Sequence, residues 1–175
     1  MCGITGFYLK GKDYQRSNLN ENLILMSKEL SHRGPNAKGT WIDDTNKLGF
    51  GHARLSIRDL SQKGNQPMIS SCKRYVIIYN GEVYDTRNLE NELTNASINL
   101  KSSSDTEVLL EYIANFGLKN TLEKINGMFA FALYDIKKQK LYLVRDRLGI
   151  KPLFYYINNN SFSFGSEIKS LKKFF

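Results

Sequence analysis

The chain has 175 residues, 41% of them hydrophobic, and a formal net charge of +8, with no Pro-rich or Gly/Ser-rich linker. We therefore expect one compact domain over residues 1–175, large enough to form a core without covalent cross-links. No segment reaches the ~20 apolar residues of a transmembrane helix, and two cysteines are too few for a disulfide framework, so we expect a cytoplasmic protein that does not span a membrane.

The first half of the chain predicts strands that alternate with helices. Residues 3–9 are short and apolar, as in a strand, whereas 18–30 have apolar residues at helical spacing. Strands are predicted at 38–43 and 48–52, joined by a turn rich in Asp, Thr and Asn, and a strongly β-forming run covers 74–81.

Two helices are expected in the middle of the chain. Asp85 can cap a short helix over 86–94. The stretch "SSSDTEVLLEYIANFG" predicts a second helix, in which Ser104 and Glu107 have the spacing of a capping box and Gly117 marks the end.

The last third of the chain changes to four short β-like runs, "GMFAFALYD", "KLYLVRD", "PLFYYIN" and "SFSFGS", which predict hairpins or a meander. In "FAFAL", large residues alternate with Ala130 and Ala132, so one face of this strand is bulky and the other small. Both faces are expected to be covered, which indicates stacked layers.

The densest run of positive charge lies between Lys137 and Lys151, with six basic residues against the single acid Asp146. Such a run could contact phosphates, and RNA binding is one hypothesis. No nucleic-acid-binding motif accompanies the charge, so a solvated hairpin face is the preferred interpretation and no nucleic-acid partner is expected.

The second residue, Cys2, has a property that no other cysteine in the chain shares. If Met1 is removed, the thiol stands beside a free α-amine, whose ordinary pKa of about 7.7–8.0 lies near working pH. One residue would then supply both a nucleophile and a general base. The next residue, Gly3, lets a substrate approach the backbone closely.

Seven motifs resemble, in order, the glutaminase domain of class II glutamine amidotransferases: "MCGITGF", "SHRGPN", "GHARLSIRD", "YNGEVYD", "SSDTEV", "NGMFAFALYD" and "RDRLGIKPLFYY". Within that class the chain most resembles the N-terminal domain of glutamine-hydrolysing asparagine synthetases. The resemblance implies an α+β fold, the four-layer αββα N-terminal-nucleophile hydrolase sandwich with two stacked antiparallel sheets. It also implies hydrolysis of L-glutamine to glutamate and ammonia.

The resemblance also implies the roles of individual residues. Cys2 would form a thioester, while Asn80 and the backbone N–H of Gly81 would stabilise the oxyanion. Arg54 would bind the α-carboxylate of glutamine, and Asp105 and Glu82 would bind its α-ammonium. The pocket wall would be formed by Leu55, Ser56, Ile57 and Arg58. A guanidinium fork suits a carboxylate.

Simpler interpretations exist for single residues. Arg54 could be a surface ion-pair partner, Asn80-Gly81 a hairpin turn, and Asp105 a helix-dipole residue. Neither His32 nor His52 has zinc-like spacing, so structural roles and no metal are expected for both. Cys72 is expected to pack as a small apolar residue.

These 175 residues hold no Gly-rich "SGGxDS" phosphate loop, so ATP and Mg are implied only for a missing synthetase domain and no cofactor is expected here. The implied partners are L-glutamine and a synthetase domain in cis or in trans, and a homodimer is possible. Two alternatives stay open. One is a degenerate glutamine-binding regulatory module, and the other is a glutaminase domain serving a different carboxylate-amidating enzyme.

Overall fold

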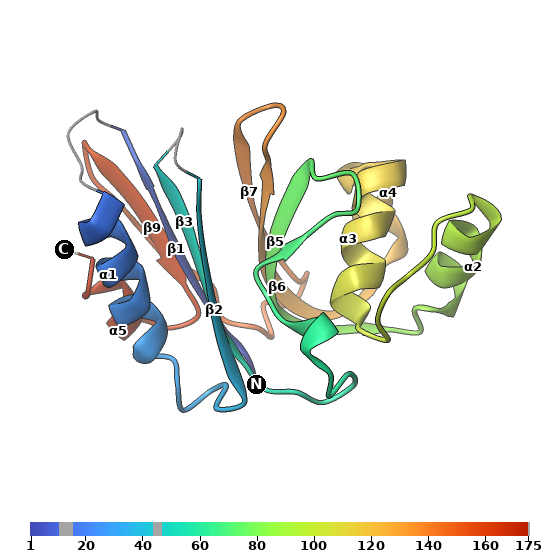
Figure 1. Ribbon diagram of the computed structural model, residues 1–175, viewed down its shortest axis with the longest axis horizontal. Helices are drawn as coiled ribbons and strands as arrows, with labels where there is room; N and C mark the ends of the chain where they lie inside the picture. Colours follow the sequence, from blue (N-terminus) through green and yellow to red (C-terminus); the bar gives the residue numbers. More distant parts are fainter. Residues whose placement is uncertain (11–15, 44–46, 175) are drawn as a thin grey trace.

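A computed structural model describes residues 1–10, 16–43 and 47–174, which form two antiparallel sheets stacked face to face between outer helices (Figure 1). Sheet A has the strand order β2-β3-β1-β9-β8 and sheet B has the order β4-β5-β6-β7. The strands of sheet A are β1 (Gly3–Leu9), β2 (Ala37–Asp43), β3 (Leu48–Arg54), β8 (Phe154–Ile157) and β9 (Ser161–Gly165). Those of sheet B are β4 (Met68–Ile69), β5 (Tyr75–Tyr84), β6 (Asn126–Asp135) and β7 (Lys140–Arg145).

The helices complete the four layers. They are α1 (Arg16–Lys28), α2 (Arg87–Asn95), α3 (Asp105–Phe116), α4 (Leu118–Lys124) and α5 (Ile168–Leu171), with a short 3-10 turn at Gln62–Gly64. Helices α1 and α5 cover the outer face of sheet A, and α3 and α4 cover that of sheet B, with α2 beyond them (Figure 1). This arrangement confirms the predicted α+β αββα sandwich.

The alternation in β6 divides its side chains between two cores, as predicted. Phe129, Phe131 and Leu133 pack in the cluster under α3, whereas Ala130 and Ala132 face the space between the sheets. Small residues on the inner face leave room for large side chains of sheet A. Among them are Ile4, Leu48, Phe50 and Phe164.

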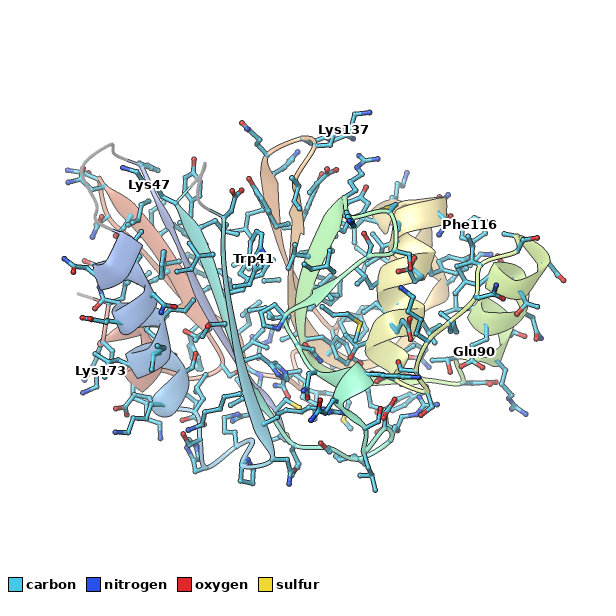
Figure 2. All side chains as sticks on the ribbon, viewed as in Figure 1. Trp41, Lys47, Glu90, Phe116, Lys137 and Lys173 are labelled. Carbon is cyan, nitrogen blue, oxygen red and sulfur yellow. The ribbon has the colours of Figure 1, made fainter. Side chains whose placement is uncertain are left out.

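Trp41 of β2 packs into this inner layer against Phe50 and Tyr134, with ring centroids 5.9 and 6.1 Å away (Figure 2). On the other face of sheet A, α1 lies close because β3 presents Gly51 to it. A Cβ at Gly51 would lie 2.1 Å from the Ser27 hydroxyl of α1. The glycine therefore sets how closely the helix approaches the sheet.

Two details of the predicted helix starts are wrong. Asp85 does not cap α2: its backbone is left-handed, with φ 46°, and its carboxylate pairs with Arg87 at 2.8 Å. Thr86 stands at the N-cap without a side-chain cap bond. At α3, Ser104 caps as predicted by accepting from the Thr106 N–H, but Glu107 binds the preceding loop. The predicted end of α3 at Gly117 is confirmed.

The four C-terminal β runs form two hairpins that belong to different sheets. β6 and β7 pair in sheet B, whereas β8 and β9 pair in sheet A. A single meander would have kept all four in one sheet. Helices α4 and α5 were not predicted, and the expected turn between β2 and β3, at residues 44–46, lies outside the described residues.

Three further residue predictions can be compared with the fold. Cys72 is exposed, so its predicted apolar packing is wrong. The run from Lys137 to Lys151 does not form one patch: Lys137 stands at the tip of the β6–β7 hairpin (Figure 2), whereas Lys151 is buried. Within the ranges that the structure describes, no helix is long and apolar enough to cross a membrane.

His52 has the structural role that was expected, because it links the two sheets. Its side chain is buried, and Nε2 donates a hydrogen bond to the Tyr79 carbonyl of β5 at 3.2 Å. Burial lowers the pKa of His52 to about 4, although the bond to Tyr79 opposes the shift. Its Nδ1 has no hydrogen-bond partner among the described residues, so a second proton would have no acceptor there.

Acid should therefore destabilise the fold through His52. His52 takes up a proton near pH 6.5 in the unfolded state but only near pH 4 in the folded state. Protonation therefore leaves the free energy of unfolding unchanged above pH 6.5 and lowers it as the pH falls from 6.5 to 4. The difference between the two pKa values corresponds to about 3 kcal/mol in the free energy of unfolding. We would measure the free energy of unfolding in urea at pH 7 and at pH 4. Between these two pH values, His52→Gln should lose less of this free energy than wild type loses. A variant with the wild-type loss would contradict this role.

Candidate active site

One pocket gathers every residue that the sequence predicted for the site. Met1 and Cys2 line it, and the N-terminus lies at one end of the sandwich, between the two sheets (Figure 1). The predicted residues that line it are Cys2, Arg54, Leu55, Ser56, Ile57, Arg58, Asn80, Gly81, Glu82 and Asp105. They come from the N-terminus, the end of β3 with the segment after it, the end of β5 and the first turn of α3. These four segments are far apart in the sequence.

Cys2 is held at both its thiol and its backbone. The Leu55 N–H donates to Sγ at 3.3 Å, and the thiol faces the Leu55 carbonyl at 3.6 Å. The Cys2 carbonyl accepts from Nε of Arg33 at 3.0 Å. Burial raises the pKa of the thiol, an effect that the Leu55 hydrogen bond and nearby positive charges oppose. The thiol is therefore neutral near pH 7 and needs a base in order to attack.

Asn80 contributes a buried amide without a partner. Its side chain is 1% exposed and faces the space between the sheets, yet neither Oδ1 nor Nδ2 has a hydrogen-bond partner among the described residues. Buried amides in folded proteins are nearly always bonded, so an unpaired one in a pocket wall is available to a ligand. Asn80 lies within a strand, so the simpler interpretation of Asn80-Gly81 as a hairpin turn is wrong.

The carboxylate of Asp105 is fixed at the start of α3. Its Oδ2 accepts hydrogen bonds from the Tyr79 hydroxyl at 3.0 Å and from the Val83 N–H at 3.1 Å. Burial raises the pKa of Asp105, whereas the two hydrogen bonds lower it. Glu82 lies nearby with an exposed side chain at the rim.

Arg54 is buried and held by neutral acceptors. Its Nη1 donates to the Ser61 carbonyl at 2.7 Å and to Oδ1 of Asn65 at 2.8 Å, and its Nη2 donates to the Asp59 carbonyl. Throughout residues 1–10, 16–43 and 47–174, no carboxylate forms an ion pair with it. A surface ion pair is therefore the wrong interpretation, and the positive charge of the buried guanidinium lies beside the pocket.

The segment after β3 differs along its length. Leu55 touches the site through its backbone, and the Ser56 N–H is bound by Asn36 at 3.0 Å. Ile57 is 74% exposed and Arg58 is exposed, so both stand at the mouth of the pocket.

Several pocket residues were not predicted. Gln66 is buried, accepts from the Tyr79 N–H at 2.6 Å and donates to the Thr106 hydroxyl at 3.1 Å, so it ties β5 to α3 beneath the site. Lys151 is 5% exposed, and its ammonium donates to the thioether of Met1 at 3.2 Å. No local signal marks Gln66, because its role depends on contacts between distant segments.

The pocket therefore combines a thiol, an unpaired amide, a buried cation and a buried carboxyl group. A guanidinium and a carboxylate in one pocket suit a zwitterionic ligand such as an amino acid. In the part of the chain that the structure describes, no cluster of His, Cys, Asp and Glu has the geometry of a metal site.

Comparison with known proteins identifies the family of this chain. The family described as "Glutamine amidotransferase domain" matches residues 1–175. The chain is 41% identical over 175 residues to asparagine synthetase [glutamine-hydrolyzing] 3 of Bacillus subtilis, covering 98% of this chain and 27% of that protein. It is 35% identical over 181 residues to amidase chry2 of Gibberella zeae, covering 99% and 27%.

The fold has close structural counterparts. The chain matches the glutamine phosphoribosylpyrophosphate amidotransferase of B. subtilis, solved with ADP and GMP, with a TM-score of 0.79 and 20% identity, over 98% of this chain and 43% of that one. The chain thus shares the fold of that amidotransferase domain. The chain spans about a quarter to a third of the length of the curated relatives that it matches.

The close packing around Gly81 can be tested through stability. A Cβ at this position would lie 2.4 Å from the Met128 carbonyl of the neighbouring strand β6, so Gly81→Ala must push the two strands apart. We expect its free energy of unfolding in urea to fall by about 1–3 kcal/mol. Asn91→Ala on the exposed surface of α2 should change it by less than about 0.5 kcal/mol. Equal stability of Gly81→Ala and wild type would show that the strands can absorb the methyl group.

Proposed function

The chain belongs to the glutamine amidotransferase domain family, and we propose that it hydrolyses L-glutamine to glutamate and ammonia through a thioester on Cys2. We further propose that the ammonia serves an asparagine-synthetase-type, ATP-dependent amidation. The observation that carries the proposal is the unpaired, 1% exposed amide of Asn80 in the same pocket as the Cys2 thiol. Such an amide suits an oxyanion that exists only while the amide bond of the substrate is being cleaved.

The reaction begins with removal of Met1. While Met1 is attached, the Cys2 nitrogen belongs to a peptide bond and is not a base. Once it is free, the α-amine takes the thiol proton as sulfur attacks the carboxamide carbon of glutamine. The amide group of Asn80 and the N–H of Gly81 stabilise the negative oxygen of the tetrahedral intermediate.

Collapse of that intermediate breaks the carbon–nitrogen bond. The Cys2 ammonium returns its proton to the leaving nitrogen, so ammonia departs and the acyl group remains on sulfur as a thioester. The amine then removes a proton from water, the hydroxide attacks the thioester, and glutamate leaves as the thiol recovers its proton. Cys2 thus serves as nucleophile, base and acid.

Recognition of glutamine rests on the two charged groups of the pocket. Arg54 binds the α-carboxylate, and its rigid hold by Ser61 and Asn65 fixes the guanidinium plane before the substrate arrives. Asp105, with Glu82 at the rim, binds the α-ammonium. A positive substrate group would favour the ionised form of Asp105 and offset the effect of its burial.

The consumer of ammonia is proposed to be a synthetase domain that holds ATP and Mg, in cis or in trans. Its docking is supported by large apolar side chains near the pocket mouth that stand in solvent, Ile57, Leu148 and Ile150, at 74, 85 and 52% exposure. A different carboxylate as acceptor is the second candidate, because one relative of comparable similarity is named amidase chry2 and not an asparagine synthetase. Joined to a synthetase domain, the chain should support glutamine-dependent asparagine formation; amidation of another acid alone would favour the second candidate.

Turnover of the processed chain tests the reaction directly. Intact mass should first show the loss of Met1, and incubation with glutamine should then release glutamate. Cys2→Ala should abolish the release, whereas Cys72→Ala, which changes the exposed cysteine, should leave it intact. Glutamine binding without turnover, and no mass adduct from a diazo-ketone glutamine analogue, would instead identify a regulatory module.

The roles of Asn80 and Asp105 predict changes in different kinetic constants. Asn80→Ala removes a donor needed only in the transition state, so kcat should fall by about 10²–10³ with little change in KM. Asp105→Asn removes a charge that binds the substrate before and during reaction, so KM should rise. Initial rates against glutamine concentration separate the two effects; a large rise in KM for Asn80→Ala would contradict the oxyanion role.

A further inference from the structure

The segment just before α5 holds the beginning of the chain. The Ser166 N–H donates to the Ile4 carbonyl at 2.8 Å, and the Ile4 N–H donates to the Ser166 hydroxyl at 3.0 Å. Glu167, the next residue, therefore lies beside the N-terminal strand although 160 positions separate them in the sequence.

Glu167 is the centre of a cluster of positive charge. Three basic side chains contact its carboxylate: Arg33 at 2.9 Å, His32 at 3.0 Å and Lys169 at 3.3 Å. Partial burial would raise the pKa of Glu167, but the hydrogen bonds from Arg33, His32 and Lys169 lower it to about 2. The carboxylate is therefore ionised throughout the working pH range.

Arg33 connects this cluster to the nucleophile. Its Nη1 donates to Glu167, while its Nε donates to the Cys2 carbonyl at 3.0 Å. The side chain is 10% exposed, and Nη2 is buried without a partner among the described residues. Loss of Glu167 would leave a nearly buried guanidinium without its counter-charge, which is costly and favours a change of position.

A hold on the Cys2 carbonyl matters because Cys2 is to become the first residue. A chain terminus frays unless other contacts tie it down. Once Met1 is gone, Cys2 keeps one peptide bond, and rotation about its Cα–C bond would swing the amine and the thiol together. The hydrogen bond from Arg33 to the carbonyl fixes the peptide plane that carries the Cys2 Cα, so it sets the position and direction of this rotation axis, while the bond between the Leu55 N–H and Sγ opposes the rotation itself.

We infer that Glu167 is a positioning residue for the reaction: it fixes the Arg33 guanidinium so that its Nε–H holds the Cys2 carbonyl and keeps amine and thiol aligned with the pocket. The inference rests on the proposed function. Misplacement of reacting groups by about 1 Å can cost on the order of a hundredfold in rate. The glutamine-binding groups Arg54 and Asp105 belong to other elements, so substrate binding does not depend on Glu167. Loss of Glu167 should therefore lower kcat and leave KM nearly unchanged.

The test uses Glu167→Gln in the chain freed of Met1. We expect kcat for glutamine hydrolysis to fall about ten- to a hundredfold and KM to change less than twofold. Glu29→Gln is the matched control, because it removes an ion pair of 3.6 Å with Lys173 in the same outer layer, away from Cys2. It should retain wild-type kcat. Wild-type kcat in Glu167→Gln, or equal losses in both variants, would overturn the inference.

Combination with Arg33 tests the path of the effect. If Glu167 acts through Arg33, then Glu167→Gln added to Arg33→Ala should lower kcat less than twofold further. Losses that multiply would show that Glu167 acts independently and would overturn the proposed path. Arg33→Lys provides a second variant with the charge kept: one ammonium cannot reproduce both bonds of the guanidinium, so kcat should fall as in Glu167→Gln.

Hydrogen exchange separates this inference from the proposed function. In Glu167→Gln, peptides from the first strand should exchange faster than in wild type, whereas peptides from sheet B should exchange as in wild type. This comparison needs no glutamine turnover. If the first strand exchanges faster in Glu167→Gln but wild type does not hydrolyse glutamine, the hold on the N-terminus is supported and the glutaminase is contradicted. If wild type hydrolyses glutamine but Glu167→Gln shows unchanged exchange and unchanged kcat, the glutaminase is supported and the positioning role is contradicted.

Discussion

The proposed mechanism depends on holding Cys2, which has only one covalent neighbour once Met1 is removed. In that mechanism Cys2 presents its amine and its thiol to the same pocket, with no preceding residue to restrict its rotation. The fold meets this constraint by placing β1 in the middle of sheet A, between β3 and β9. Leu55 then bonds the thiol and Arg33 the carbonyl, so strand pairing and two hydrogen bonds replace the missing peptide bond.

The strand β5 explains how one sheet supplies both the core and the site. Its inner face carries Val76 and Ile78, which pack between the sheets, and then Asn80, which lies at the pocket. The period of two thus brings an amide to a position that would otherwise hold another apolar side chain. Packing of the apolar part makes the backbone rigid, and this rigidity keeps the amide in place although it has no hydrogen-bond partner in residues 1–10, 16–43 and 47–174.

The sequence was a good guide to the strands and to the layers, because the alternation in "FAFAL" reports burial on two faces. It failed where local signals compete: Glu107 has capping-box spacing, but the backbone of Lys101 and Ser102 takes its carboxylate. Pairing within a hairpin depends on local sequence, but the sheet that a hairpin joins depends on contacts with distant strands. The sequence therefore did not predict that β6 and β7 belong to sheet B whereas β8 and β9 belong to sheet A. The residues predicted for the pocket came from the resemblance, since no local pattern joins positions 2, 54, 80 and 105. Gln66 and Glu167 carried no motif at all.

The central position of β1 also has a consequence for biosynthesis. Leu9 pairs with Ser161, so the strand that bears the nucleophile has no partner on one side until roughly 150 further residues have been made. At about 5–20 residues per second, this interval lasts about 8–30 s. If Met1 is removed as proposed, the N-terminus can therefore reach an aminopeptidase before β9 pairs with β1. In the proposed mechanism, the free amine of Cys2 can then form before the pocket is complete.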